Sequence, residues 1–398
     1  MLPFCRCFGS GYEFEGLGAK QVARGGAAVA DSDDWTAIYW NPGNLVRASR
    51  KNGREIGAEA FGGMAYMKDS NSLSSLNPPG AIFSKQSNTL GSVLGALGGV
   101  VPIGDKSALG FGFYMPLMQG TDFKDTSPAG DVLDTKGLAG IMTWNVSFSR
   151  EITQEFAAGA GVNLLYGKFK SDTTLILPAY APFSVLHSKL DADGFGLEGT
   201  FGLRYDPHPQ VSLGAVYRTG GQAPLKGHAT VNPALIFPAE SSRFEYHLRQ
   251  PPTTGLGVCY RPREEWTLTF DFDQTYWKSF RSSIDYKNSG TLLTDTANAY
   301  HWRNTWKVRL GAQYGLTERT KLLGGYSFDR PAVDAGSLDL ATTLDVPMHR
   351  FSGGVVHRWG HGLETSLGAV GGSGSRKEGS VSYRLSGWQA MGEMRLAF

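Results

Sequence analysis

Short and long connections alternate along this chain from about residue 54 onward. The short ones are polar stretches at residues 102–107, 150–155, 206–210, 261–266, 315–320 and 358–364. The long ones span roughly residues 69–87, 118–136, 172–190, 220–240, 282–300, 329–347 and 374–382. Six tight turns and seven long loops that alternate require fourteen strands, which we expect to start near residues 54, 88, 107, 138, 153, 191, 210, 241, 266, 301, 320, 348, 363 and 383. An even number of antiparallel strands, with short turns at one end and long loops at the other, is the layout of an outer-membrane β-barrel.

Within these segments apolar and polar side chains alternate with a period of two, as they do in a half-buried strand. In the segment that begins at Trp266, one face carries Trp266, Leu268, Phe270, Phe272, Tyr276 and Phe280. In the next segment the apolar face carries Trp302, Trp306, Val308, Leu310, Ala312 and Tyr314, and the opposite face carries Arg303, Lys307 and Arg309. A Lys or Arg that faces lipid at the bilayer midplane costs roughly 2 to 4 kcal/mol, so the face with the cations should line the lumen.

Composition supports the barrel over other classes. A soluble β-sandwich also alternates, but it has no reason to segregate its loops by length. The chain has 53 Gly among 398 residues and a net charge of +2, which disfavours a helical protein and gives no basic block for nucleic acid. No apolar run is long enough for a membrane-spanning helix, which needs about 18 residues. We therefore predict an all-β fold, a fourteen-stranded antiparallel transmembrane β-barrel over residues 51–398, in the outer membrane of a Gram-negative bacterium.

Two features do not fit a regular strand pattern. Pro251 and Pro252 fall inside the eighth predicted strand, and they predict a bulge or bend there because proline cannot donate to the ladder. Residues 11–50 show no strand alternation and are rich in Gly and Ala. We expect this stretch to fill the lumen of the barrel as a hatch of short helices; a tail outside the barrel is the alternative. Residues 1–10 do not form a complete secretory signal, and we interpret them as a leader remnant or an incorrectly assigned start.

The stretch "GLGAKQVARGGAAVADSDDWTAIYWNPGNL" resembles the hatch signature of the FadL-like family, the outer-membrane channels for long-chain fatty acids and aromatic hydrocarbons. The acidic pair of that signature matches Asp33 and Asp34, and its Asn-Pro-Ala motif matches Asn41, Pro42 and Gly43, with Gly in the place of Ala. The resemblance extends over residues 251–280 and 304–333. It implies a fourteen-stranded barrel with an amino-terminal hatch, in agreement with the strand number obtained from the turns.

The resemblance also implies a function. Members of the family take up hydrophobic molecules passively: a groove of the third and fourth extracellular loops captures the substrate, which then enters a pocket beside the hatch. It leaves sideways into the membrane at an inward kink in the third strand. We expect long-chain fatty acids as substrates, with aromatic or aliphatic hydrocarbons as the alternative. A ligand-binding receptor or a structural barrel without transport is a further alternative.

Candidate residues follow from these steps. Apolar residues in extracellular loops mark a binding surface, and those of the third and fourth loops are Leu175, Ile176, Leu177, Tyr180, Phe183, Leu186, Leu235, Ile236 and Phe237. The alternative is that the two loops bury each other as a lid. Gly110, Gly112 and Pro116 permit an inward bend of the third strand, although close packing against the hatch explains the glycines equally well. Arg303, Lys307 and Arg309 are candidates to attract a carboxylate, unless Asp271 and Asp273 neutralise them.

The chain ends on the alternating stretch "GWQAMGEMRLAF". Alternate residues from Trp388 to the terminal Phe398 should face lipid, while Gln389, Met391, Glu393 and Arg395 face the lumen. The terminal aromatic resembles the signal that the outer-membrane assembly machinery reads, so the expected partners are this machinery, outer-membrane lipid or detergent, and a hydrophobic small molecule. We expect a monomer, with no catalytic residue, metal or cofactor.

Overall fold

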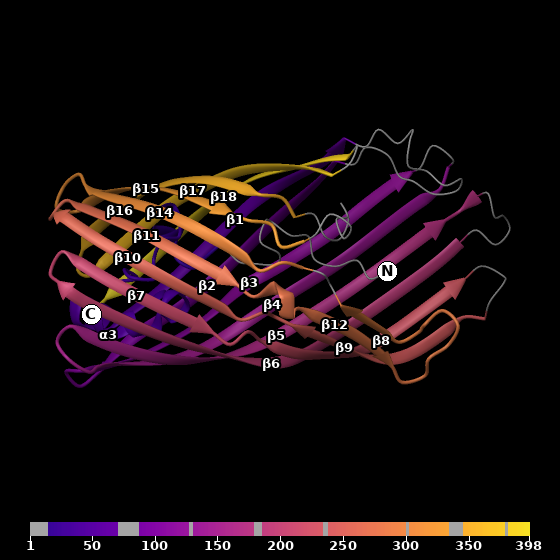
Figure 1. Cartoon of the computed structure of the whole chain (residues 1–398), viewed down its shortest axis with the longest axis horizontal. Coiled ribbons are helices and arrows are strands. Elements are labelled where there is room, and N and C mark those ends of the chain that lie inside the picture. The colour runs from indigo at the N-terminus through magenta and orange to yellow at the C-terminus, as the bar shows by residue number, and fades with distance from the viewer. Residues whose placement is uncertain are drawn as a thin grey trace.

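Successive strands pair with each other around one closed antiparallel sheet (Figure 1). In this computed structural model the described residues are 15–70, 87–126, 130–178, 185–233, 238–299, 302–333, 345–378 and 381–398. The strands are β1 (Glu55–Ser70), β2 (Ser87–Ile103), β3 (Ser107–Thr126), β4 (Val132–Glu151), β5 (Phe156–Ile176), β6 (Val185–His208), β7 (Val211–Arg218), β8 (Gln222–Pro233), β9 (Glu240–Arg249), β10 (Thr253–Arg263), β11 (Trp266–Thr275), β12 (Arg281–Tyr286), β13 (Thr296–Ala299), β14 (Thr305–Gly315), β15 (Thr320–Asp329), β16 (Met348–Gly360), β17 (Leu363–Glu378) and β18 (Val381–Ala397).

Four of the barrel strands are interrupted, so that each is made of two segments. β7 and β8 both pair with β6. On their other side, β8 pairs with β9 and β7 pairs with β10. β11 with β12, and β13 with β14, are divided in the same way. Counting each such pair as one strand gives fourteen strands, as predicted. The pairing of β1 with β18, from Glu55 opposite Ala397 to Ser70 opposite Ser382, closes the barrel.

The six short turns lie where the sequence predicts them, between β2 and β3, β4 and β5, β6 and β7, β10 and β11, β14 and β15, and β16 and β17. The break at Pro251 and Pro252 is also confirmed, because β9 ends at Arg249 and β10 begins at Thr253. Among the helices of the described residues, none is long and apolar enough to cross a membrane.

Four predicted long loops are largely strand, which corrects the sequence analysis. The connections expected at 118–136, 172–190 and 374–382 shrink because β3, β5 and β17 continue to Thr126, Ile176 and Glu378, and β8 occupies most of the one expected at 220–240. Charged residues on the outer face of β5 and β6, such as Lys168 opposite Asp193 and Lys170 opposite Asp191, made the strand ends resemble loops. Their inner face carries Phe169, Leu190 and Ala192 together with small polar residues such as Ser171. The alternation of inward and outward side chains therefore continues, but the outward side chains here are charged.

The aromatic face predicted across residues 266–280 and 302–314 is wrong at its extracellular ends. Phe280 and Trp302 do not face lipid; they are buried, with ring centroids 4.7 Å apart, and Trp277 packs against both. The reason is that β11 stops at Thr275 and a 3-10 turn, Trp277–Ser279, takes the chain out of the strand. In the regular part of β14 the predicted faces hold, since Leu310 is 46% exposed and Lys307 only 3%.

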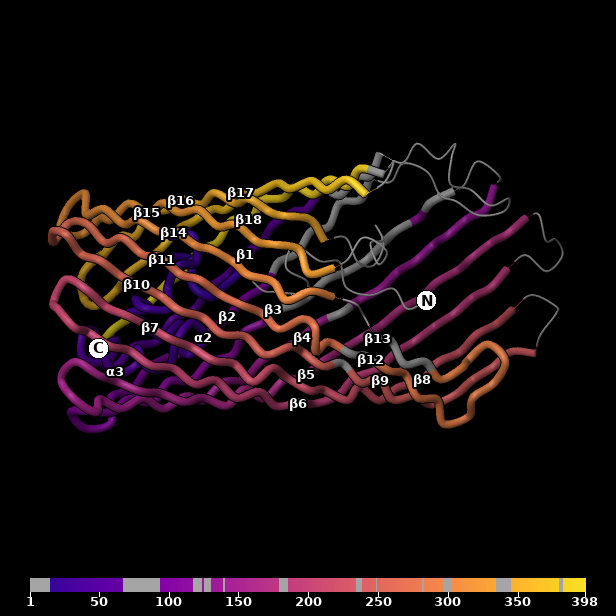
Figure 2. The backbone as a smooth tube through the Cα atoms, viewed as in Figure 1, coloured from indigo at the N-terminus to yellow at the C-terminus, as the bar shows by residue number. Residues whose placement is uncertain are grey.

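The amino-terminal residues 15–54, called the hatch segment below, lie inside the barrel near the short turns. The segment contains α1 (Ala19–Ala23), α2 (Ala37–Trp40), a 3-10 turn at Pro42–Asn44 and α3 (Leu45–Asn52). In Figure 2 its indigo trace runs within the outline of the strands. Leu17, Trp35 and Leu45 are fully buried, and the segment contacts strands from β1 to β18. These contacts argue against a tail outside the barrel. Residues 1–14, which include the expected leader remnant, lie outside the described part of the chain.

Candidate functional site

The Asn-Pro-Gly motif forms a corner that docks the hatch segment on the wall. The Asn41 side chain accepts a hydrogen bond from the Gly43 amide (2.9 Å) and donates to the carbonyl oxygens of Val29 (2.8 Å) and Leu203 (2.9 Å). Leu203 belongs to β6, so this amide joins the hatch segment to the barrel. The corner sits on Gly202 of β6, where an added Cβ would lie 2.0 Å from the Asn41 Oδ1 atom. Sequence analysis identified Asn41, Pro42 and Gly43 but not this glycine. Asn41 is 162 residues away from Leu203, the neighbour of Gly202, so no local pattern links the corner to β6.

The acidic residues of the hatch segment take different partners. Asp33 forms ion pairs with Lys20 and Lys51. Burial acts to raise its pKa, but the Lys20 ammonium, followed by Lys51, holds the pKa of Asp33 well below its usual range. Asp34 instead accepts hydrogen bonds from Gln21 (2.8 Å) and from the Thr36 amide (3.0 Å). Lys20 also lies 3.9 Å from the Asp34 carboxylate, so it contacts both acids. The two aspartates therefore hold parts of the hatch segment together, Asp33 through two lysines and Asp34 mainly through Gln21 and Thr36.

A third acidic residue, Asp31, was not identified from the sequence, and it reaches the wall. Its carboxylate pairs with Arg24 (2.8 Å) and with Arg261 of β10. Burial opposes ionisation, yet the two guanidinium groups of Arg24 and Arg261 lower the pKa of Asp31 to about 2. The carboxylate is therefore charged at neutral pH and forms a bridge between the hatch segment and β10.

Asp271 of β11 also links the barrel wall to the hatch segment. One carboxylate oxygen accepts hydrogen bonds from the backbone amides of Ala28 (2.6 Å) and Val29 (2.8 Å). An aspartate that was expected only as a neutraliser of lumenal cations thus binds the backbone of the hatch segment.

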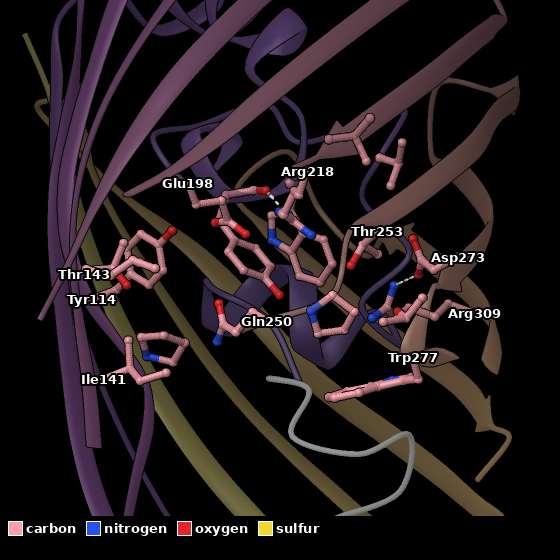
Figure 3. Close-up of a pocket in the computed structure, with 18 residues that line it drawn as sticks. Tyr114, Ile141, Thr143, Glu198, Arg218, Gln250, Thr253, Asp273, Trp277 and Arg309 are labelled. Atoms are coloured by element: carbon pink, nitrogen blue, oxygen red, sulfur yellow. Dashed lines mark hydrogen bonds and ion pairs between the residues drawn. The ribbon is translucent and has the colours of Figure 1, made fainter. Parts of the chain in front are cut away.

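A cavity of about 130 Å³ lies between the hatch segment and the wall (Figure 3). Val29, together with Tyr39 and Trp40 of α2, forms the hatch side of the cavity. The wall contributes aromatic, aliphatic and proline side chains together with a few polar groups, and the lining residues include Tyr114, Pro116, Ile141, Thr143, Leu165, Val216, Gln250, Pro251, Thr253, Thr275 and Trp277. A concave pocket in which apolar side chains surround placed polar groups is a common form of a small-molecule site; here polar and apolar residues line the cavity in similar numbers.

Four charged residues line the same cavity: Glu198, Arg218, Asp273 and Arg309. Arg309 forms an ion pair with Asp273, and its guanidinium carbon lies 5.5 Å from the centroid of the Trp40 ring. Arg218 donates to the carbonyl oxygen of Tyr39 and lies 4.4 Å from the centroid of the Tyr39 ring. The remaining predicted cations differ. Lys307 is buried and pairs with Asp329 (3.3 Å), whereas Arg303 is exposed and precedes β14.

The wall beside this cavity is not fully hydrogen-bonded. Among the described residues, pairing between β2 and β3 runs from Ile103 opposite Ser107 to Ala96 opposite Tyr114 and stops there. Beyond that point β2 remains paired with β1, and β3 with β4. The register of β3 against β4 shifts between Tyr114 and Leu117, and Pro116 lies in the shifted stretch. We call this unpaired stretch the β2–β3 gap.

The predicted lateral-opening residues divide between two places. Pro116 lies at the β2–β3 gap and lines the cavity. Gly110 and Gly112 lie nearer the short turns, and an added Cβ at either position would come within 3.0 Å of the Ile38 side chain of the hatch segment. The two glycines therefore make room for the hatch segment, as the alternative interpretation proposed.

The predicted capture residues also divide. Leu175 and Ile176 are strand residues of β5, paired with Leu186 and Val185 of β6. Leu177 follows β5 directly, and Tyr180, Phe183, Leu235, Ile236 and Phe237 lie outside the described residues. Leu186 packs against a buried cluster on the inner faces of five strands, called the extracellular cluster below, whose members include Phe169, Leu190, Leu225, Val231, Phe244, Tyr246 and Ile284.

The family comparison settles the class of this barrel. Residues 12–349 match the sequence model described as outer membrane protein transport protein (OMPP1/FadL/TodX). The chain belongs to this family. It is an outer-membrane β-barrel of the OMPP1/FadL/TodX family, whose members transport hydrophobic substrates.

Individual relatives are distant. The chain is 23% identical over 259 residues to a 47 kDa outer membrane protein of Pasteurella multocida, a match that covers 59% of this chain and 60% of that protein. A putative outer membrane protein of Neisseria meningitidis is 22% identical over 393 residues, with 88% of this chain and 83% of that protein covered. Among solved structures, a Pseudomonas aeruginosa FadL homologue superposes with a TM-score of 0.77 at 17% identity, covering 97% of this chain and 100% of the other. The Pseudomonas putida toluene transporter TodX gives 0.76 at 17% identity, with 97% and 99% covered. These structures support the fold.

Proposed function

We propose that this OMPP1/FadL/TodX family member takes up hydrophobic molecules by passive diffusion, through the cavity beside the hatch segment and out into the bilayer at the β2–β3 gap. The substrates we propose are long-chain fatty acids or aromatic and aliphatic hydrocarbons. The observation that carries the proposal is that Tyr114 and Pro116 belong to both places: they line the cavity, and they stand where the pairing of β3 with β2 ends.

A sideways route suits an apolar solute. Unpaired backbone groups inside a bilayer cost several kcal/mol each, so a gap in a barrel wall at that depth is expensive unless it serves a purpose or is covered. A hydrophobic molecule that leaves through the wall enters hydrocarbon directly and avoids water. Leu186, which is partly exposed at the edge of the extracellular cluster, supports the first step, because an apolar side chain there offers the solute a contact as it leaves water.

The test is to close the β2–β3 gap with a disulfide. Gly95 and Met115 come next in register after the last pair, Ala96 and Tyr114, so the double variant Gly95→Cys and Met115→Cys joins the strands across the gap. We expect uptake of a hydrophobic probe by cells to fall when the two cysteines are oxidised to the disulfide and to return when the disulfide is reduced.

A matched control is the double variant Leu97→Cys and Phe113→Cys, whose positions already face each other in the paired part of β2 and β3. Its oxidation should leave uptake unchanged. Equal uptake through the oxidised and reduced Gly95–Met115 variant would contradict the sideways route. Probe binding to the purified barrel without uptake by cells would favour the receptor alternative.

A further inference from the structure

The cavity beside the hatch segment holds balanced charge. Its described lining contains two cations, Arg218 and Arg309, and two anions, Glu198 and Asp273. Figure 3 shows them as two groups, with Glu198 and Arg218 toward one end of the cavity and Asp273 and Arg309 toward the other. Each cation therefore has an anion nearby inside the same cavity.

The Arg309 group is the more deeply buried. Besides its ion pair with Asp273, the guanidinium interacts electrostatically with Asp329, and Trp40 lies against it. Asp329 in turn pairs with Lys307 (3.3 Å) and with Arg350. The buried cations around Arg309 all have carboxylate partners: Arg309 pairs with Asp273, Lys307 with Asp329, and Arg350 with Asp329 and Glu15. A ligand carboxylate that entered here would add an anion where every cation already has a carboxylate partner.

The Arg218 group is held by the hatch segment. Its guanidinium is engaged by the Tyr39 carbonyl oxygen and ring, and it interacts electrostatically with Glu198. Glu198 is fixed by Asn163, whose side-chain nitrogen donates to it over 2.7 Å. A ligand carboxylate that approached Arg218 would meet the negative charge of Glu198 at the same place.

We infer that this cavity selects uncharged hydrophobic molecules and rejects free carboxylates, with Glu198 and Asp273 as the specificity-determining residues. The inference rests on the proposed function and narrows its substrate class. A carboxylate loses its hydration on entering the cavity and gains no unmatched cation in return, so burial of its charge is not compensated. An uncharged molecule loses little and gains contact with the rings of Tyr39, Trp40, Tyr114 and Trp277, which favour flat apolar groups. Discrimination then comes from the repulsive element that the two acids supply.

The test compares two probes that differ only in the carboxylate. Naphthalene and 2-naphthoate are titrated at pH 7.5 into the purified full-length barrel, and the ratio of their dissociation constants is measured. We expect naphthalene to bind at least about tenfold more tightly than 2-naphthoate, as one uncompensated charge interaction predicts. Glu198→Gln removes the negative charge but keeps a side-chain oxygen for Asn163, so it should shift the ratio toward 2-naphthoate by about fivefold or more. Asp273→Asn should shift the ratio in the same direction.

The ratio separates specificity from stability, because a variant that merely loosens the cavity weakens both probes alike. Glu245→Gln is the matched control, because Glu245 lies on the outer face of β9 opposite Lys226, away from the cavity. The ratio of the two dissociation constants in this variant should equal that of the wild type. Equal binding of both probes by the wild type, or an unchanged ratio in Glu198→Gln, overturns the inference while the proposed function stands. If the wild type binds neither probe, the proposed function fails and the inference falls with it.

Discussion

Glu59 on β1 and Glu393 on β18 lie directly opposite each other across the seam that closes the barrel, and each accepts a hydrogen bond from the hatch segment. The Gly18 amide donates to Glu59 over 2.9 Å, and the Trp35 indole nitrogen donates to Glu393 over 2.9 Å. Both carboxyl groups are nearly fully buried. Like charges directly opposite on neighbouring strands are destabilising, so this seam holds the hatch segment at some electrostatic cost.

The first prediction concerns this seam. Glu393→Leu leaves the buried Trp35 indole without its acceptor and should lower the free energy of unfolding by about 1 to 3 kcal/mol. Glu393→Gln keeps an acceptor oxygen and removes the like-charge contact with Glu59, so its stability should equal or exceed that of the wild type. Denaturant unfolding of the barrel in detergent, followed by tryptophan fluorescence, measures both. A destabilised Gln variant would show that the two carboxylates do not repel each other in the folded state.

The second prediction is a pH dependence from Asp31. Its folded pKa of about 2 lies below the value of about 3.9 for an unfolded Asp. The stabilisation is therefore fully present above about pH 4 and is lost as the pH falls toward 2. A shift of roughly two pKa units corresponds to about 2 to 3 kcal/mol.

The measurement compares wild type with Asp31→Asn at several pH values. At pH 7 the variant should be less stable by about 2 to 3 kcal/mol, and the difference should shrink toward zero near pH 2. Asp105→Asn, in an exposed turn between β2 and β3, is the control and should match the wild type throughout. A difference between wild type and Asp31→Asn that stays constant from pH 7 to pH 2 would contradict the ion pairs with Arg24 and Arg261.

The third prediction tests the docking of the hatch corner. In Gly202→Ala the new methyl group would lie 2.0 Å from the Asn41 Oδ1 atom and 2.8 Å from the Gly43 amide nitrogen, so the corner must move. We expect faster hydrogen exchange at the backbone amides of Asn41, Gly43 and Asn44, and higher permeability of cells to small solutes that the barrel normally excludes. Gly324→Ala on β15 is the control, since an added Cβ there meets nothing within 4 Å. Unchanged exchange in Gly202→Ala would mean that the corner is not seated on β6.

The sequence predicts the parts of this structure that depend on local patterns. Turn spacing gives the strand number, and the phase of alternation places Lys307 and Arg309 inside and the apolar face of the last strand outside. The sequence does not predict where the tertiary structure breaks the alternation, as at Trp302, because an aromatic side chain fits a lipid-facing position and a buried cluster equally well. Partners far apart in sequence, such as Asp31 and Arg261, leave no local signal either. Charge neutralisation in the cavity was open from the sequence, since it depends on which acids lie within reach of each arginine.

The last prediction concerns the extracellular cluster. Leu186 lies on the inner face of β6 against this cluster, whereas its neighbour Val185 is 37% exposed. Successive residues of a strand point to opposite faces, so the two positions form a matched pair. Leu186→Asp places a charge on the apolar surface along which we expect hydrophobic substrate to leave water, and it should reduce the initial uptake rate several-fold. Val185→Asp places the same charge on the other face and should leave the rate close to wild type. The rates are measured with a radiolabelled hydrophobic probe in cells that contain equal amounts of folded barrel. Equal loss of uptake in both variants would point to a general effect of charge on assembly, and no loss in either would remove the extracellular cluster from the route.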